Sequence, residues 1–182
     1  MKQWTHEKLK RYCIDRLFEI EQINHYSHTP SAFVCIVAFI SFLSELAYGT
    51  NEYDNKAGKR YRDFIERYLP KYRAYKEDFY STFRCGIVHS MTLYKPVKNK
   101  RLAVNKVDLP KIVITHDLNY AKLNEIEKYK KNGFDAIVIY AFDLCREIRD
   151  AIDVMFDSKE PNNPAYGNAI DFVKYQKPIG AL

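Results

Sequence analysis

The sequence lacks the short signatures of the commonest catalytic sites. It has no glycine-rich phosphate loop, no GxSxG or HExxH segment and no paired-carboxylate arrangement, which argues against P-loop nucleotide binding, serine hydrolysis and zinc proteolysis. His25 and His28 have no Cys or carboxylate at ligand spacing nearby. There is also no CxxC pair among the four cysteines, Cys13, Cys35, Cys85 and Cys145. We therefore expect no metal, no cofactor and no disulfide framework.

A secretory leader and a clear membrane span are also missing. The first residues run from Met1 into a charged amphipathic segment. The most apolar run, Ala32–Tyr48, is uninterrupted only over the nine residues Ala32–Ile40, whereas a spanning helix needs about 20 apolar residues. We expect this run to be the central core helix of a soluble, cytoplasmic protein that has reduced thiols and no membrane contact.

Acidic residues are absent from one long stretch of the chain. Between Phe79 and Val107 there is no Asp or Glu, but there are six basic residues: Arg84, Lys95, Lys98, Lys100, Arg101 and Lys106. The whole chain has a net charge of +6 and a pI near 9.0, so this stretch alone equals the net charge. Such a local positive field favours a polyanionic partner such as RNA, DNA or anionic lipid, although an ordinary solvated loop is the alternative.

Aromatic and apolar side chains are abundant and recur at helical spacing. The hydrophobic share of 47% excludes disorder, and the 15 tyrosines suit either a contact surface or the flanks of helices. Apolar residues three and four apart, with capping and breaking residues between the runs, predict a series of helical segments. They cover about Thr5–Asn24, Ser31–Tyr48, Lys59–Leu69, Pro70–Ser90, Asn119–Lys131 and Phe134–Phe156.

Short β-branched runs predict a small hairpin or extended insertion near residues 101–115. The expected fold is therefore mainly all-α: an antiparallel bundle of four to five helices with this one β insertion. We assign residues 1–158 to the bundle domain and residues 159–182 to a C-terminal tail that docks on the domain or on a partner.

The pair Arg84 and His89 combines a permanently charged phosphate ligand with the side chain that titrates near neutral pH. Cleaving RNA without a metal needs these two capabilities, because a proton must move and charge on the phosphate must be held. On an ideal α-helix, however, residues five apart lie about 140° from each other. The pair converges only if Gly86 loosens the helix, if the motif ends the helix, or if two copies meet across a dimer axis.

The eleven residues Tyr80–Ser90, at the end of an aromatic helix, resemble the signature segment of HEPN-domain proteins, in which an Arg is followed after four to six residues by a His. The bundle-like pattern over Thr5–Phe156 resembles that family more loosely. The resemblance implies a metal-independent endoribonuclease in a toxin–antitoxin or other defence system. It also implies a homodimer whose two motifs line one cleft, with RNA as substrate and an antitoxin or other protein as partner. Arg84 would bind and polarise the scissile phosphate, and His89 would be the acid–base residue.

Residues around the motif are candidates for substrate binding. They are Tyr80, Ser81, Cys85 and Ser90 beside the motif, Tyr94 as a base-stacking ring, and Lys95, Lys98, Lys100 and Arg101 as contacts to the RNA backbone. Each has a structural alternative: Tyr80 can pack in the core, and Ser90 can satisfy backbone groups at a helix end.

Cys85 departs from the family pattern, which usually has Asn, Asp or His after the motif Arg. It lies four residues before His89 and therefore on its face of an α-helix, but a thiol is a weak hydrogen-bond partner for an imidazole. The alternative function is a non-catalytic HEPN-like helical scaffold that binds a protein partner or nucleic acid.

Overall fold

The computed structural model of the chain describes residues 5–27, 30–48, 57–87, 112–115, 127–131 and 134–157. Most of these residues are helical, as the mainly α class predicts. The longer helices are α1 (His6–Ser27), α2 (Pro30–Tyr48), α3 (Ala57–Tyr68) and α7 (Ala141–Asp157). A second helical run follows α3 in three short pieces: the 3-10 helix η2 (Pro70–Tyr75), α4 (Lys76–Asp78) and the π-helix η3 (Phe79–Ile87).

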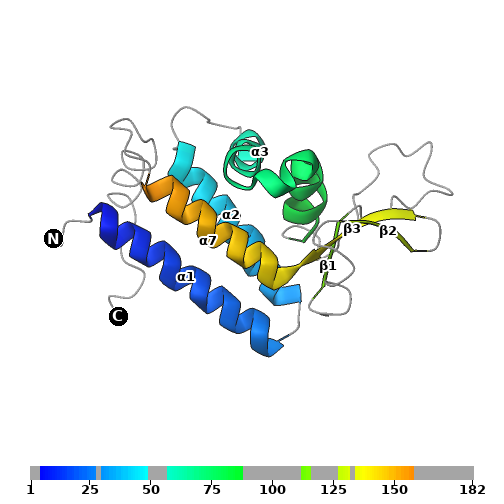
Figure 1. Cartoon of the computed structure of the whole chain (residues 1–182), viewed down its shortest axis with the longest axis horizontal. Helices are drawn as coiled ribbons and strands as arrows, with labels where there is room; N and C mark the ends of the chain where they lie inside the picture. Colours follow the sequence, from blue (N-terminus) through cyan, green and yellow to red (C-terminus); the bar gives the residue numbers. More distant parts are fainter. Residues whose placement is uncertain are drawn as a thin grey trace.

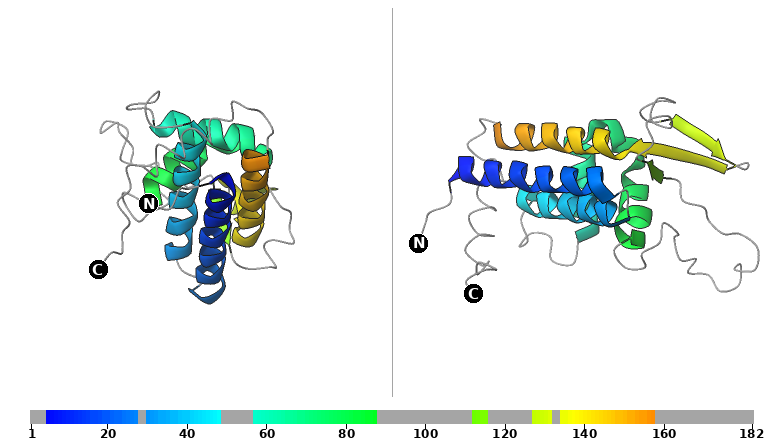
Figure 2. Two further views of the ribbon diagram at one scale, coloured as in Figure 1. Left: turned by 90° about the vertical axis from the view of Figure 1, so that its left-hand side faces the viewer. Right: turned by 90° about the horizontal axis from the view of Figure 1, so that it is seen from below.

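The helices α1, α2 and α7 lie side by side, and α1 runs antiparallel to the other two (Figures 1 and 2). The helix α3 and the pieces that follow it lie across this group and pack on α2 and α7. The apolar core is enclosed between them, with fully buried side chains from α1, α2, α3, η2, η3 and α7, among them Leu17, Ile40, Phe64, Phe79 and Ile148. The segment from Phe79 is therefore anchored on the core.

The helix α1 begins at a capping threonine and is tied to α7 by ion pairs. The backbone N–H of Lys8 donates to Thr5 Oγ1 at 3.3 Å, which satisfies one of the free donors of the first turn. Lys10 Nζ lies 2.8 Å from carboxylate oxygens of both Asp153 and Asp157. The inner face of α1 is apolar at helical spacing, with Leu9, Cys13 and Leu17 buried, so α1 covers α2 and α7 as its sequence period predicts.

The helix α2 is apolar on nearly all sides. Its residues Ser31–Tyr48 are long and apolar enough to cross a membrane by length and composition alone, and half of that stretch is buried inside the protein. Helices at the centre of soluble proteins have the same composition. The cytoplasmic location therefore stays a prediction.

A three-stranded sheet extends from one end of the helices (Figure 1). Its strands are β1 (Ile112–Thr115), β2 (Glu127–Lys131) and β3 (Phe134–Tyr140), in the order β1-β3-β2. The pair β1 and β3 is parallel, with Ile112 opposite Ile137, whereas β2 and β3 are antiparallel, with Lys131 opposite Phe134. The strand β3 runs directly into α7.

This sheet corrects two helix predictions. A helix was predicted over Asn119–Lys131, but Glu127–Lys131 forms the strand β2. The last helix was predicted to begin at about Phe134, but it begins at Ala141. The run Ile137–Tyr140 is β-branched and aromatic, which suits a strand, and a short apolar run does not distinguish the two states. The β insertion expected near 101–115 is extended over Ile112–Thr115, but residues 101–111 and the tail 159–182 lie outside the described residues.

Candidate functional site

The predicted fourth helix changes its geometry before it reaches Arg84. Pro70 opens it after Leu69, as expected of a residue that cannot continue α3. The last piece, η3, is a π-helix over Phe79–Ile87, a form that is rare and occurs often at functional sites. Its i→i+5 hydrogen bonds and about 4.4 residues per turn place residues five apart within about 50° of each other. In an α-helix the same separation is about 140°.

Tyr80 and Cys85, five positions apart on η3, lie close enough to influence each other electrostatically. Burial raises the pKa of the Tyr80 phenol, and the neighbouring Cys85 thiol raises that pKa further. The guanidinium carbon of Arg84 lies 5.8 Å from the centre of the Tyr80 ring. Tyr80, Arg84 and Cys85, all predicted from the sequence, therefore form one cluster on η3.

The helix α3 completes the cluster with three residues that no pattern in the sequence indicates as site residues. The guanidinium carbon of Arg62 lies 5.0 Å from the centre of the Tyr80 ring, and the Tyr61 ring lies 5.9 Å from it, centre to centre. The backbone of Gly58 lies against the end of the same ring. Tyr80 is half-buried against the core, so the alternative in which it packs in the core is correct for part of its ring. We call Tyr80, Arg62 and Arg84 the arginine–tyrosine cluster.

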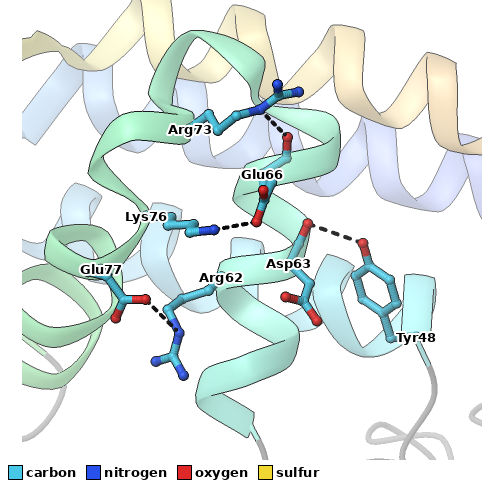
Figure 3. A network of polar contacts seen from close by, with 7 residues as sticks. All are labelled: Tyr48, Arg62, Asp63, Glu66, Arg73, Lys76 and Glu77. Atoms are coloured by element: carbon cyan, nitrogen blue, oxygen red, sulfur yellow. Dashed lines mark hydrogen bonds and ion pairs between the residues drawn. The ribbon is translucent and has the colours of Figure 1, made fainter.

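Polar contacts fix α3 against the chain that leads into η3 (Figure 3). Arg62 Nε lies 3.2 Å from Glu77 Oε1, and Lys76 forms an ion pair with the Glu66 carboxylate. Arg73 Nε also donates to the backbone carbonyl oxygen of Glu66 at 3.1 Å. These contacts lie at or near the surface, where a single ion pair contributes little stability. Together with the buried face of α3, they position η3 over Gly58 and Arg62.

The hydroxyl of Tyr61 is a buried polar group without a hydrogen-bond partner. Its side chain is almost fully buried, at 1% exposure. Burial raises the pKa of this phenol strongly, Arg84 lowers it and Cys85 raises it, so the hydroxyl lies within electrostatic range of the cluster. Leaving such a group unpaired costs about 1–3 kcal/mol.

The remaining predicted site residues divide into two groups. Ser81 is half-buried on η3 beside Tyr80. The others lie outside the described residues: His89, Ser90, Tyr94, Lys95, Lys98, Lys100 and Arg101. The convergence of Arg84 and His89 therefore stays a prediction. Within the described ranges, no group of three or more His, Cys, Asp or Glu residues is placed to hold a metal ion.

A second surface feature is an open groove of about 360 Å³ between α1 and α2. Its apolar lining includes Tyr12, Ile23 and Phe42, and Tyr12 and Ile23 are 38% and 37% exposed. An ion pair between Arg16 and Glu19, with an N–O distance of 2.7 Å, belongs to the same lining. Apolar surface of this kind is typical of contacts with another protein.

Comparison of the chain with models of known protein families, with curated proteins and with solved structures gives no match.

Proposed function

We propose that this chain is a metal-independent endoribonuclease of the HEPN type, built on an antiparallel bundle of four to five helices and acting as a homodimer. In this mechanism Arg84 binds the scissile phosphate and His89 moves the proton. The 2′-oxygen of the ribose attacks the adjacent phosphorus, the bond to the 5′-oxygen breaks, and that oxygen leaves with a proton. The products are a 2′,3′-cyclic phosphate and a 5′-hydroxyl end. A defence or toxin role, with an antitoxin as partner, belongs to the same proposal.

The observation that carries the proposal is the π-helical geometry around Arg84. The backbone hydrogen bonds of the π-helix η3 span five residues, the same separation as from Arg84 to His89. Residues at this separation lie on one side of a π-helix, so the geometric objection that an ideal α-helix raises does not hold for π-helical geometry.

The surroundings of Arg84 also favour an anionic substrate. A second guanidinium, that of Arg62, lies over the same tyrosine ring. Residues 57–87 carry eight basic and four acidic side chains, and the stretch that follows Phe79 has no acidic residue up to Val107. Positive charge therefore predominates in the sequence before and after Arg84, which favours an RNA strand as ligand.

The test is cleavage of RNA by the purified full chain in excess EDTA. Mixed-sequence single-stranded RNA should be cut to fragments with cyclic phosphate ends, and RNA methylated at every 2′-oxygen should stay intact, because its nucleophile is blocked. His89→Ala and Arg84→Ala should each abolish cleavage. His25→Ala and Arg16→Ala, which change the same residue types on α1, should leave it unchanged. Absence of cleavage, or cleavage that survives His89→Ala, would contradict the proposal.

A second candidate function, a non-catalytic scaffold, is favoured by the apolar groove between α1 and α2. In that case the exposed Tyr12 and Ile23 side chains of the groove contact a protein partner, and Cys85 reflects the loss of a catalytic neighbour for His89. This function predicts a folded protein that leaves RNA intact and whose partner binding is weakened by Tyr12→Ala and not by Arg84→Ala.

A further inference from the structure

The arginine–tyrosine cluster holds two guanidinium groups at one aromatic ring, and they come from different elements. Arg62 belongs to α3 and Arg84 to η3, and their guanidinium carbons lie 5.0 and 5.8 Å from the centre of the Tyr80 ring. The two carbons are therefore no further apart than the sum of those distances. Both side chains are partly accessible to solvent. Stacking on a tyrosine holds each guanidinium in place, which reduces the conformational entropy that binding would otherwise cost.

Glu77 provides Arg62 with a carboxylate partner that a ligand can replace. Arg62 Nε lies 3.2 Å from Glu77 Oε1, and the Glu77 side chain is 70% exposed, against 28% for Arg62. An ion pair with so exposed a partner is weak in water. A phosphate offers the same guanidinium charged oxygens in the two-pronged geometry that arginine prefers. The carboxylate thus occupies the place that a phosphate oxygen would take.

We propose that Arg62 is a second phosphate-binding residue of the site, that it acts with Arg84 on the backbone of one RNA strand, and that Glu77 is the internal competitor which the RNA displaces. This inference rests on the proposed function, because it takes RNA as the ligand. Tyr80 is then a positioning residue that holds both arginines. It does not serve as the stacking platform for a base.

The competitor role has a physical consequence that a simple basic patch lacks. If Glu77 occupies Arg62 in the free protein, removing its charge frees Arg62 and tightens RNA binding. That gain depends on Arg62 being present, so it disappears when Arg62 is also replaced. A general change of net charge would instead give the same gain in either background.

The helix α1 contains a matched control. The guanidinium carbon of Arg16 lies 5.3 Å from the centre of the Tyr12 ring, and Arg16 pairs with Glu19 at 2.7 Å. Arg16→Ala and Arg62→Ala each remove one positive charge stacked on a tyrosine and paired with a glutamate. Glu19→Gln and Glu77→Gln likewise each remove one exposed negative charge. Comparing the α1 variants with the Arg62 and Glu77 variants therefore shows whether RNA affinity depends on where a charge is removed or only on the change in net charge.

The experiment measures binding of the full chain to single-stranded RNA methylated at every 2′-oxygen, which binds but is not cleaved by 2′-oxygen attack. We expect Arg62→Ala to weaken the affinity about tenfold and to reduce the slope of log K against log salt by about one. Glu77→Gln should tighten binding several-fold, and it should have no effect in the Arg62→Ala chain. Arg16→Ala and Glu19→Gln should each change the affinity less than twofold. Thermal unfolding of each variant checks that it folds.

Three outcomes would overturn the inference: no binding by the parent chain, Arg62→Ala no weaker than Arg16→Ala, or Glu77→Gln no tighter than Glu19→Gln. Because Glu77 is exposed, Glu77→Gln tests the inference even if Arg62→Ala does not fold. Failure of the nuclease proposal is distinguishable from failure of this inference. If the protein binds methylated RNA through Arg62 but leaves ordinary RNA intact, the phosphate-binding role of Arg62 is supported and RNA cleavage is refuted.

Discussion

Gly58 and the ring of Tyr80 are in direct contact across the boundary between α3 and η3. A β-carbon built on Gly58 would lie 2.5 Å from Cζ of Tyr80 and 2.8 Å from its hydroxyl oxygen, closer than side-chain atoms approach one another. The two elements meet at this distance only because position 58 has no side chain. This contact sets where the Tyr80 ring lies, and the guanidinium groups of Arg62 and Arg84 lie against that same ring.

Replacing Gly58 by alanine should therefore disturb the site more than the fold. The new methyl group pushes the Tyr80 ring away from α3, and the arginines lose their common support. We expect binding of methylated RNA to weaken about tenfold. The free energy of unfolding should change little, because alanine's helix propensity, worth at most about 1 kcal/mol over glycine near a helix end, offsets part of the clash.

Tyr80→Leu provides the control for this change, since it removes the ring atoms that the methyl group meets. In the Tyr80→Leu chain, Gly58→Ala should cause no further loss of RNA affinity in the same binding assay. An undiminished affinity in the single variant Gly58→Ala would contradict the role we give to the contact.

Arg84→Lys should be far from conservative if Arg84 holds the scissile phosphate. Lysine keeps the positive charge but presents a single point of contact in place of the planar fork, and it does not stack in the same way on Tyr80. We expect the cleavage rate to fall by roughly 10²-fold, similar to the loss of one donor to a developing oxyanion. Arg67→Lys is the control, because Arg67 also lies over a tyrosine, with its guanidinium carbon 5.4 Å from the centre of the Tyr68 ring. Equal rates for Arg84→Lys and the unaltered chain would show that Arg84 does not contact the phosphate in this way.

The sequence predicted the helices whose signals are local. The predicted starts of helical segments at Thr5 and Pro70 and the apolar spacing in α2 and α3 are confirmed, because each depends on residues within one or two turns. The strand β3 was predicted as helix because Ile137–Tyr140 also fits the apolar spacing of α7. Its state depends instead on pairing with β1 and β2, which the local pattern does not contain.

For the site, the sequence pointed to Arg84, Tyr80 and Cys85 but to none of their α3 neighbours. The period of α3 predicts the buried face that contains Tyr61. It gives no signal that Arg62 and Gly58 meet η3, because that contact depends on how two elements cross. The π geometry of η3 was not predictable either, since apolar spacing is read against α-helical and extended periods.

The hydroxyl groups of Tyr61 and Tyr48 differ in their hydrogen bonding. Tyr48 donates its hydroxyl to the backbone carbonyl oxygen of Asp63 at 3.1 Å, whereas the buried Tyr61 hydroxyl has no partner. Tyr61→Phe should therefore raise the free energy of unfolding, by about 1 kcal/mol, because it removes a desolvated group that no hydrogen bond compensates. Tyr48→Phe should lower it by about 0.5–1.5 kcal/mol. Urea denaturation of both variants measures the difference, and destabilisation by Tyr61→Phe would mean that its hydroxyl is hydrogen-bonded in solution.

The buried thiols of Cys13 and Cys145 should make the protein lose stability at alkaline pH. Burial raises the pKa of each thiol from an ordinary value of 9.0 to about 12, and for Cys145 the neighbouring Glu21 adds to the effect while Arg149 opposes it. Between these two values the folded chain keeps a proton that the unfolded chain has lost. Folding is therefore increasingly disfavoured from about pH 9 upwards, by about 1.4 kcal/mol per pH unit for each thiol. Below pH 9 both states hold the proton and the thiols add no pH dependence.

Cysteine-to-alanine variants separate this effect from the titration of lysines and tyrosines over the same range. Cys13→Ala and Cys145→Ala each leave a small cavity, which lowers the free energy of unfolding by a similar amount at every pH. Above pH 9, each variant should also lose about 1.4 kcal/mol per pH unit of the pH dependence of the free energy of unfolding, and the double variant should lose about twice as much. The measurement is the free energy of unfolding in urea at intervals from pH 7 to pH 11. Curves for the variants that run parallel to that of the parent chain would show that these thiols ionise as easily in the folded protein as in the unfolded one, and so that the two helices α1 and α7 do not exclude water from them.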